Sequence, residues 1–461
     1  MSVAAHLCGG LVGALVLTAA VGPAPAVAAP GEITRVSVDS QGRQGSDDSY
    51  APAISADGRF VAFDSEAPDL IGRDTNRAPD VFVRDRRTGR TTRVSVAGTG
   101  TEGNRGSYTP AISGDGRWVA FVSEATNLVP GDTNGDPDVF LHDRRTKRTV
   151  RLSVATDGRE TTGGTSPVIS RNGRYVVYNV GTPLRSVGDD SDLAGMFLYD
   201  TRTGKRTRLP GVAGVDPSIS ADGRYVAFSS EVRDLVPGDT NHVFDCFVLD
   251  RRTGRISRVS VGPKGRQGNG ESSGAVISAN GRYVAFASTA SNLVRGDTNR
   301  VDDVFVRDLR AGTTRRVSVR PGGGQADGIS GGPVLSASGR YLLFLSAAGN
   351  LVRADRGGAD FHIYRADLRT GALVRVTSSP TGRPANAEST SFPALSADGR
   401  TVAFGSRASN LVRGDTNGRD DIFVREFSRP PARTGGVASV ESSAPTADSP
   451  DATSVPRRMG I

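Results

Sequence analysis

Short apolar runs alternate with polar turns along most of the chain. The phrase ISADGRFVAF, which begins at residue 54, shows the pattern: an apolar residue and a serine, then Asp-Gly, then a dense apolar run. Asp-Gly and Asn-Gly favour tight hairpin turns because both positions tolerate positive φ. The run after the turn has almost no polar residues, which indicates a strand covered on both faces. The pattern therefore predicts antiparallel strands.

The same phrase occurs seven times. The other copies are ISGDGRWVAF, ISRNGRYVVY, ISADGRYVAF, ISANGRYVAF, LSASGRYLLF and LSADGRTVAF. Their turn glycines are Gly58, Gly116, Gly173, Gly223, Gly281, Gly339 and Gly399. Copies at such regular spacing are typical of repeat folds, in which each unit buries its apolar faces against its neighbours.

Each copy predicts four strands. The first ends at Ile-Ser or Leu-Ser, the second is the VAF phrase, the third the DVFVRD phrase, and the fourth the RVSV phrase after an RRTG turn. Four-stranded meanders stacked face to face around an axis are propeller blades. The sequence thus predicts an all-β, seven-bladed β-propeller of four-stranded antiparallel blades over residues 30–428.

The fourth strands indicate how the ring closes. RVSV-type phrases lie at 35–38, 93–96, 151–154, 258–261 and 316–319, with looser versions at 208–209 and 375–376. The first precedes the first Asp-Gly turn, and the last unit ends at DIFVREF without one. We therefore expect the N-terminal strand at 33–38 to complete the last blade, built by residues 392–427, which leaves no unit with a bare edge.

The repeat resembles a known family. The pattern P-x-[IL]-S-x-[DN]-G-R-x-[VL]-[AVL]-F, followed by D-[VI]-F-V-x-D-x-x-[TA]-G, looks like the WD-like repeats of TolB-type propellers and covers about residues 33–427. The resemblance implies a binding platform of the bacterial envelope, or a gating domain of the kind fused to serine peptidases. TolB itself has an α/β domain before a six-bladed propeller. Here the first predicted strand almost directly follows the apolar segment at residues 1–29, which argues against a role in the Tol–Pal system.

The two ends of the chain differ from the repeats. Residues 1–29 form an apolar segment that ends in Ala26-Val27-Ala28, which is typical of a secretory signal peptide, although the segment has no Lys or Arg. Residues 429–461 are rich in Pro, Ala, Ser and Thr and should be disordered. We expect a secreted, extracytoplasmic protein of the cell envelope. Its mature chain would keep one cysteine, Cys246, and no transmembrane segment.

The formal net charge of +8 suits an anionic surface partner such as a cell-wall polymer. The turns between third and fourth strands concentrate this charge in Arg86, Arg87, Arg90, Arg144, Arg145, Lys147, Arg251, Arg252 and Arg255. These basic residues have two interpretations. They are solvated turn residues without a function, or they form a docking surface for an anionic polymer. Basic runs with interleaved aromatics are missing, so nucleic acid is not expected as a partner.

Five units carry a D-T-N-x-x-x-D motif in the long loop between second and third strands. Long loops on a rigid scaffold are where binding usually occurs, and the loops that lead into the innermost strands should line the mouth of the central channel. Alternating Asp and Asn resembles a calcium loop, yet about three side chains are too few for calcium, and no EF-hand pattern is matched. The alternative is an Asx turn with Asn in the left-handed region and the second Asp capping a loop amide. The candidate Ca²⁺ ligands are Asp74, Asn76, Asp80, Asp132, Asn134, Asp138, Asp239, Asn241, Asp245, Asp297, Asn299, Asp303, Asp415, Asn417 and Asp421.

Five intact motifs should behave alike. The third unit replaces the motif by residues 189–192 and reaches Gly195 instead of the second Asp. The sixth replaces it by residues 355–357 and reaches Phe361. These two units should therefore behave differently from the other five.

Catalytic residues are not expected. Two G-x-S-x-G matches, 270–274 and 328–332, precede predicted strands with no helix to follow, so they do not form a nucleophile elbow. Beyond the leader the histidines are His142, His242 and His362, which with Cys246 show no zinc spacing.

We thus expect a monomeric, non-catalytic platform that binds protein or glycan partners and is stiffened by calcium. The alternative is a propeller enzyme, such as a lactonase, lyase or glycosidase, with its site at the channel mouth. Acidic residues available there are Asp47, Asp48, Glu102, Glu160 and Glu271, which look scattered rather than repeated.

Overall fold

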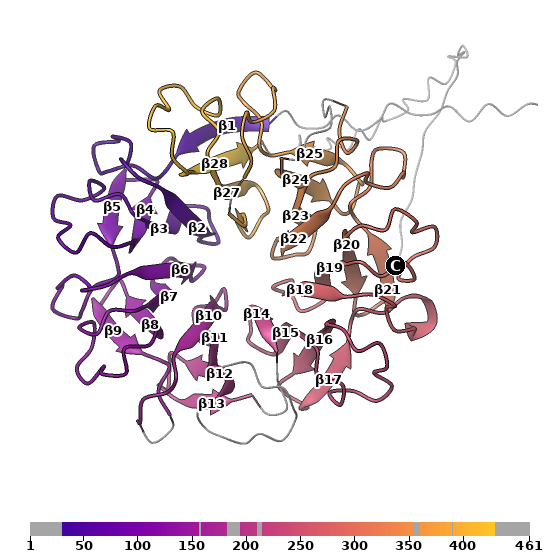
Figure 1. Ribbon diagram of the computed structural model, residues 1–461, viewed down its shortest axis with the longest axis horizontal. Helices are drawn as coiled ribbons and strands as arrows, with labels where there is room; N and C mark the ends of the chain where they lie inside the picture. The colour runs from indigo at the N-terminus through magenta and orange to yellow at the C-terminus, as the bar shows by residue number, and fades with distance from the viewer. Residues whose placement is uncertain are drawn as a thin grey trace, which may run out of the picture. The chain divides into compact units, whose positions relative to one another are not determined.

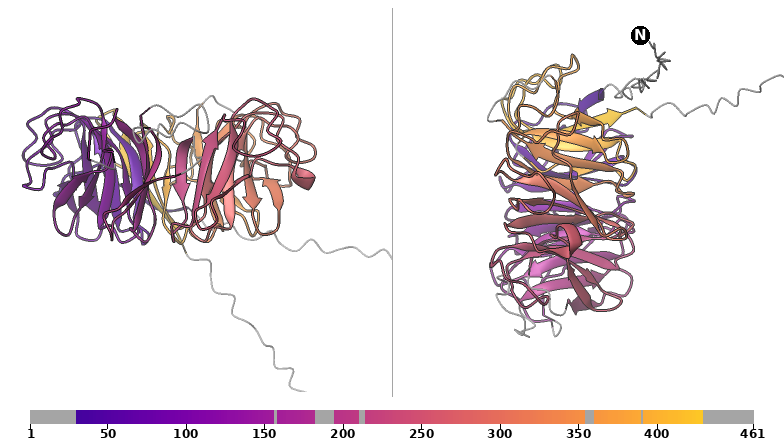
Figure 2. Two further views of the ribbon diagram at one scale, coloured as in Figure 1. Left: turned by 90° about the horizontal axis from the view of Figure 1, so that it is seen from below. Right: turned by 90° about the vertical axis from the view of Figure 1, so that its right-hand side faces the viewer.

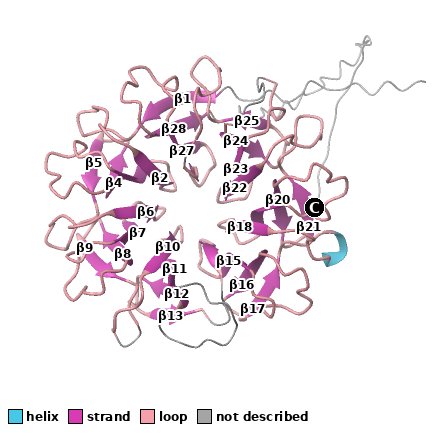
Figure 3. Cartoon of the chain, in the orientation of Figure 1, coloured by secondary structure: helices cyan, strands magenta, loops and turns pink. Residues whose placement is uncertain are grey.

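Seven four-stranded antiparallel sheets form a ring around a central channel (Figure 1). The computed structural model describes residues 30–155, 158–181, 194–209, 214–353, 360–389 and 391–428. Within these residues the chain is almost entirely strand and loop (Figure 3), with one short 3-10 turn, η1, at Pro263–Gly265. The predicted seven-bladed β-propeller is confirmed.

Six blades run in chain order from the innermost strand to the outermost. Blade 1 is β2 (Ser49–Ile54), β3 (Phe60–Ser65), β4 (Asp80–Asp85) and β5 (Arg90–Arg93); blade 2 is β6 (Ser107–Ile112), β7 (Trp118–Ser123), β8 (Asp138–Asp143) and β9 (Arg148–Arg151). Blade 3 is β10 (Gly164–Ile169), β11 (Tyr175–Val180), β12 (Gly195–Asp200) and β13 (Arg206–Arg208); blade 4 is β14 (Val215–Ile219), β15 (Tyr225–Ser230), β16 (Asp245–Asp250) and β17 (Arg255–Arg258). Blade 5 is β18 (Ser272–Ile277), β19 (Tyr283–Ser288), β20 (Asp303–Asp308) and β21 (Thr313–Arg316); blade 6 is β22 (Ser330–Leu335), β23 (Tyr341–Ser346), β24 (His362–Asp367) and β25 (Leu373–Arg375).

The seventh blade joins the two ends of the propeller. It consists of β26 (Ala394–Leu395), β27 (Thr401–Ser406) and β28 (Asp421–Phe427), with β1 (Pro30–Arg35) as its outermost strand. β1 pairs with β28 in antiparallel register, with Ile33 opposite Arg425 and Arg35 opposite Phe423. The prediction that the N-terminal strand completes the last blade is therefore confirmed, and in Figure 1 the indigo and yellow strands lie side by side.

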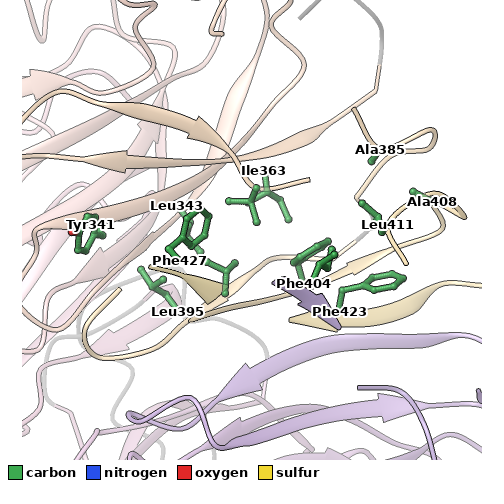
Figure 4. Close-up of a cluster of buried hydrophobic side chains, with 13 residues drawn as sticks. Tyr341, Leu343, Ile363, Ala385, Leu395, Phe404, Ala408, Leu411, Phe423 and Phe427 are labelled. Carbon is green, nitrogen blue, oxygen red and sulfur yellow. The ribbon is translucent and has the colours of Figure 1, made fainter. Parts of the chain in front are cut away.

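The core lies between neighbouring blades. The second and third strands of each blade contribute a pair of aromatic rings, such as Phe63 and Phe82, whose centroids lie 5.9 Å apart. Each blade packs these rings and its branched aliphatic residues against the next sheet. Figure 4 shows one such layer, where Leu343 and Ile363 of blade 6 lie among Phe404 and Phe423 of blade 7. Strands buried on both faces explain the dense apolar runs in the sequence.

The fourth strands end earlier than predicted. They stop at the arginine that begins each RVSV phrase, as β5 does at Arg93, so the Val-Ser-Val residues lie beyond the strand. One further backbone bond, from Val94 N to Val81 O (2.8 Å), extends the pairing before the chain turns away. Ser95 then faces β4, where its hydroxyl accepts a hydrogen bond from Val81 N. A hydroxyl that bonds to a neighbouring backbone competes with the strand ladder, which explains the early end.

The connections separate onto two faces of the ring, which the side view in Figure 2 shows as a flat structure. We call the face with the two tight turns of each blade the turn face, and the opposite one the loop face. On the turn face Arg59 of the first turn binds Asp85, at the end of β4, with 2.6 Å between Nη2 and Oδ2. The same pair recurs in blades 2 to 6. Both ends of the described propeller, at 30 and 428, leave from the turn face, because Pro30 pairs with Phe427.

The innermost strands of the first six blades contain a bulge. Each repeat has a proline or alanine at the same place in this strand, and the residue before it has positive φ. These residues are Ala51, Thr109, Ser166, Asp216, Gly274 and Gly332. Blade 7 has one more residue between Ser389 and Pro393 than blade 1 has between Ser49 and Pro52. In this blade the described innermost strand, β26, has only two residues. Phe392, shortly before this strand, is largely exposed, at 72%.

Several predictions concern residues that the structure does not describe. The signal peptide at 1–29, the tail at 429–461 and the replaced motifs at 189–192 and 355–357 all lie outside the described residues. Within the described ranges no helix has the length and hydropathy needed to cross a membrane.

Candidate functional site

An arginine lies among the carboxylates of each D-T-N loop. In blade 2 the Nη1 atom of Arg151 is 2.9 Å from Asp132 Oδ1, 3.2 Å from Asp138 Oδ2 and 2.9 Å from Glu160 Oε1. The side chain of Arg151 is 7% exposed and that of Asp138 is fully buried. We call such a group an arginine cluster. The arginine is the first residue of the RVSV phrase, so the outermost strand of the blade supplies a cation to the loop.

All five intact motifs form this cluster. The arginines are Arg93 in blade 1, Arg151 in blade 2, Arg258 in blade 4, Arg316 in blade 5 and Arg35 in blade 7. Arg35 comes from the other end of the chain and reaches Asp415 and Asp421 at 3.7 and 3.4 Å. The five motifs thus share an arginine, and in each of them the guanidinium supplies the counter-charge that buried carboxylates require.

The remaining motif residues bind the loop that precedes the next blade. In blade 1 the Thr75 hydroxyl donates to Glu102 Oε2 (2.6 Å), and Asn76 Nδ2 donates to Gly103 O (2.8 Å). Asn76 Oδ1 also accepts from Ala78 N, so the expected Asx turn is present. The residue in the left-handed region, however, is Arg77 (φ 55°) and not the asparagine.

We expected the second aspartate to cap a loop amide, but it does not. Asp80 is fully buried, and its Oδ1 accepts a hydrogen bond from the Ser95 hydroxyl (2.6 Å between Oγ and Oδ1). Asp80 also contacts Arg93. Ser95 is the serine of the RVSV phrase. The same bond joins Ser37 to Asp421 and Ser260 to Asp245. The serine and the arginine of the RVSV phrase therefore both contact the second aspartate of the motif.

A glutamine or glutamate completes each cluster at a repeated position. The residues are Gln44, Glu102, Glu160, Gln267 and Gln325, and each follows the cluster arginine by nine places in the sequence. Glu102 and Glu160 are therefore not scattered, and they lie in the arginine clusters rather than at the channel mouth. The spacing to the arginine was the signal that could have identified them. The loops before the next blade contact the D-T-N loops, as Gly103 O does by accepting a hydrogen bond from Asn76 Nδ2.

Blade 1 differs from the other four clusters. Asp74 Oδ1 is buried without a hydrogen-bond partner, and its distance to Arg93 Nη1 is 3.9 Å. Burial and the nearby charge of Asp80 raise the pKa of Asp74 to about 6, although Arg93 opposes the shift. Carboxylate oxygens of Asp74, Asp80 and Glu102 all lie within 4.8 Å of one another. These oxygens could ligate a divalent cation, but Arg93, which contacts Asp80 and Glu102, would have to move.

The channel mouth on the loop face is acidic. Burial and the charges of Asp48, Asp420 and Glu66 raise the pKa of Tyr50, at the start of β2, to about 12. Burial, followed by the charges of Glu124, Asp64 and Glu66, raises the pKa of Tyr108 in the same position of blade 2. In blade 5, burial and the charge of Glu271 raise the pKa of Asp302. We call the group Asp48, Glu66, Glu124, Glu271, Asp302 and Asp420 the acidic mouth. Two of its carboxylates have an arginine beside them, Arg419 at 3.5 Å from Asp48 and Arg407 at 3.4 Å from Asp420.

An apolar groove of about 400 Å³ lies beside the acidic mouth, between blades 6 and 7. Ile329, Leu345, Phe361 and Phe392 line it, with Glu388 at its edge. Ile329 (47% exposed) and Phe392 are the two large hydrophobic residues that are exposed within the described part of the chain. Ser389, which also lines the groove, has a buried hydroxyl without a partner. In blades 1, 2, 5 and 6 the equivalent serine bonds to a serine of the second strand.

The other residues considered for catalysis have structural surroundings. The serines of the two G-x-S-x-G matches, Ser272 and Ser330, belong to this serine pairing and start innermost strands. Burial lowers the pKa of His142 to about 4, and its Nδ1 lies 2.9 Å from Thr149 Oγ1. Burial raises the pKa of Cys246, in β16, well above its usual range. His142 lies in blade 2, Cys246 in blade 4 and His362 in blade 6, so these three residues do not come together in one blade.

The basic turns are partly used by the fold. The first arginine of the turn reaches back to the first turn of its blade, as Arg86 Nη1 does to Gly58 O (2.8 Å). Arg144 also stacks on Phe60 of the neighbouring blade, with its guanidinium carbon 4.5 Å from the ring centroid. The second arginines, such as Arg252, remain exposed on the turn face.

Comparison with known proteins indicates the fold but no family. No protein-family model and no curated protein matches the sequence. Among solved structures, an oligogalacturonate lyase in complex with manganese is similar, with a TM-score of 0.51 and 13% identity over 86% of this chain and 93% of that chain. An oligogalacturonate lyase from Vibrio parahaemolyticus has a TM-score of 0.50 and 14% identity over 86% and 98% of the two chains. TolB from Acinetobacter baumannii also matches, with a TM-score of 0.39 and 14% identity over 81% and 82%. The resemblance to TolB and other propellers predicted from the repeats is therefore found, and at these identities it concerns the fold alone.

Proposed function

We propose that this protein is a non-catalytic binding platform whose recognition surface is the loop face around the acidic mouth. The observation that carries the proposal is the pair of exposed residues Ile329 and Phe392, which lie in one groove next to the acidic mouth. Exposed apolar residues that gather in one place on a soluble surface mark interaction sites more often than scattered ones do. The carboxylates that first suggested chemistry are instead bound by arginine in five blades.

The charge of the mouth defines the kind of partner. Its six carboxylates outnumber the two arginines that contact them, so the mouth would attract cations and repel polyanions, whereas the exposed arginines of the turn face would do the opposite. The groove adds room for an aromatic or aliphatic side chain. We therefore expect a protein partner that presents an apolar side chain next to basic residues on the loop face. An anionic cell-envelope polymer, if one binds, would contact the turn face.

Peptide display tests this proposal. The mature protein, beginning at residue 30, is immobilised and used to select random dodecapeptides, and the selected peptides are measured against Phe392→Ser and Arg252→Ser variants. We expect peptides with Arg or Lys beside an aromatic or aliphatic residue, a loss of binding of tenfold or more in Phe392→Ser, and no change in Arg252→Ser. Peptides that bind both variants as well as the parent protein would contradict the proposal.

We propose that the expected metal binding takes place in blade 1, where the cluster would bind a divalent cation. The unpartnered Asp74 oxygen supports blade 1 over the other four clusters. Because an ion would compete with the Arg93 guanidinium, Arg93→Met should increase the thermal shift caused by Ca²⁺ or Mn²⁺, and Asp74→Asn should remove it. No shift by either ion in the parent protein and in Arg93→Met would eliminate the metal site.

The enzymatic alternative can be tested with the substrate that the similar lyases are named for. We would incubate the mature protein with oligogalacturonate and Mn²⁺ and follow the unsaturated product by absorbance. We expect no product, because the acidic mouth would repel this polyanion. Product formation that Asp74→Asn abolishes would replace the platform proposal by an enzymatic one.

Export to the cell envelope is proposed on the pattern of residues 1–29 alone. Fractionation of cells that express the full chain with a C-terminal tag would test it. A processed protein outside the cytoplasm is expected.

A further inference from the structure

The central channel has one side chain that its repeat does not predict. The residue after Ser in the first turn of each unit is small in six blades: Ala56, Gly114, Ala221, Ala279, Ala337 and Ala397. Backbone hydrogen bonds join these residues around the axis, for example from Ala56 N to Gly114 O (2.9 Å) and from Ala397 N to Ala56 O (2.9 Å). At Gly114 the approach is so close that an added Cβ would lie 2.5 Å from Arg171 O. Blade 3 alone has a large residue here, Arg171.

Arg171 extends across the channel. Its Nη2 atom donates to Leu395 O in blade 7, at 3.2 Å. Burial lowers its pKa, and the charge of Asp398, which is exposed at the rim, opposes the shift. No carboxylate of the described residues lies within ion-pair distance of Arg171. Arg171 is half-buried, and a cation partly removed from water without a contacting anion is unfavourable, so the free energy of the site would improve if an anion bound.

A cavity of about 300 Å³ lies next to the guanidinium. Its other lining is apolar and comes from the innermost strands, chiefly Ile112, Ile169, Ile219 and Ile277 with Val276. Ser218 adds one hydroxyl, which accepts a hydrogen bond from Ile277 N and keeps its own proton available. A water occupies about 30 Å³ in the liquid, so the cavity has space for a short hydrocarbon chain.

We propose that this cavity binds a medium-chain carboxylate, with its carboxylate on Arg171 and its hydrocarbon chain against the isoleucines of the channel. An apolar chamber with one cation matches a ligand with an apolar body and one negative charge, whereas a sugar or a peptide would leave polar groups unpaired there. This site lies inside the channel near the turn face. It is separate from the acidic mouth, so its failure would leave the proposed function untouched.

Titration calorimetry of the mature protein with octanoate tests the proposal. Each methylene that leaves water contributes about fourfold in affinity, so affinity should rise by about that factor per carbon from butanoate to octanoate. Arg171→Ala should weaken octanoate at least tenfold. Alanine is the residue found at this position in five other blades, so this variant should fold. Arg252→Ala, on the exposed turn face, is the matched control and should not change binding.

Two further measurements separate the charge from the cavity. Octanol should bind weakly and equally to the parent protein and to Arg171→Ala, because it offers no charge to the guanidinium. Val276→Phe should weaken octanoate by filling the chamber while Arg171 stays in place. The proposal is overturned if octanoate does not bind the parent protein at millimolar concentration, if Arg171→Ala binds it equally well, or if acetate binds as tightly as octanoate.

Discussion

At the scale of single residues, most charged side chains of the repeat have a partner that explains them. Arginines of the first turn bind the aspartate that ends the third strand, and arginines of the RVSV phrase bind the aspartates of the D-T-N loop. A calcium loop and an arginine cluster need the same carboxylates. The motif alone therefore could not distinguish an external cation from one supplied by the chain.

Replacement of one cluster arginine should destabilise the fold strongly. In Arg151→Met the buried carboxylates of Asp132 and Asp138 keep their charge and lose their counter-ion. Breaking a buried ion pair in this way typically costs about 3–5 kcal/mol. Urea unfolding should show a loss of about 3 kcal/mol, against less than about 0.5 kcal/mol for the exposed control Arg252→Met. Equal stability of the two variants would show that the cluster is not held by its arginine.

Asp64 should make stability fall as the pH rises. Burial raises its pKa to about 6, although Thr109 N–H donates to its Oδ1. Between about pH 4 and pH 6 the unfolded chain has released this proton and the folded protein has not, so folding becomes less favourable as the pH increases. Asp64→Asn keeps the acceptor for Thr109 and removes the titration.

Urea unfolding at several pH values checks the Asp64 prediction. Relative to the parent protein, Asp64→Asn should gain up to about 3 kcal/mol between pH 4 and pH 6.5. Asp85→Asn is the opposite control, because the Arg59 guanidinium holds the pKa of Asp85 below its usual range. Its stabilising contribution is present above about pH 4 and is lost as the pH falls, so Asp85→Asn should be most harmful near neutral pH. A parallel pH profile for Asp64→Asn and the parent protein would contradict the assignment.

At the scale of elements, the innermost strands carry strain that the other strands do not. Six of them place a residue in the left-handed region just before the channel-lining segment, and four of these residues are not glycine. Thr109 is the most unfavourable, since a β-branched residue at φ 49° is an outlier. Blade 7 has one additional residue before its proline, and Phe392 next to that proline is exposed.

Reciprocal substitutions measure the bulge. Thr109→Gly should stabilise the protein by about 1 kcal/mol, because glycine adopts positive φ without a Cβ clash and the exposed Thr109 side chain contributes little packing. Gly274→Thr should destabilise it by a similar amount, because a Cβ there has space, with Pro333 Cδ 3.9 Å away, but the backbone does not suit threonine. Thermal unfolding of both variants is the measurement. The same sign of change in both would rule out backbone strain as the cause.

At the scale of the whole molecule, ring closure depends on β1. This strand covers the outer edge of β28, and Arg35 supplies the cation for the cluster of blade 7. Bare strand edges favour association with other chains, so the strand also protects the assembled ring. The two ends of the described propeller that it brings together, residues 30 and 428, both lie on the turn face.

Circular permutation separates closure from connectivity. A permutant that joins residue 428 to residue 30 by a short glycine linker and begins at Thr253, in a turn of blade 4, should unfold within a few degrees of the parent protein. Deletion of residues 30–38 should lower the unfolding temperature clearly and produce larger species in size-exclusion chromatography. A stable, unchanged deletion variant would show that β1 is dispensable for closure.

The sequence by itself determined the fold class, the number of blades and the joining of the two ends. Apolar periodicity and turn residues are local signals, and seven copies of them average out the errors of one. Strand limits were less accurate: the Val-Ser-Val residues look like strand, but Ser95 bonds to Asp80 instead of extending the ladder.

Only the tertiary structure decided what the charged and irregular positions do. Arg93 and Asp80 are thirteen residues apart and Arg35 and Asp421 nearly the whole chain apart, so their pairing depends on strands that meet after folding. Arg171 differs from its repeat by one letter, and its location across the channel follows from the closed ring. Pairings between distant segments arise from packing, and local sequence patterns contain no information about which cation will reach a buried carboxylate.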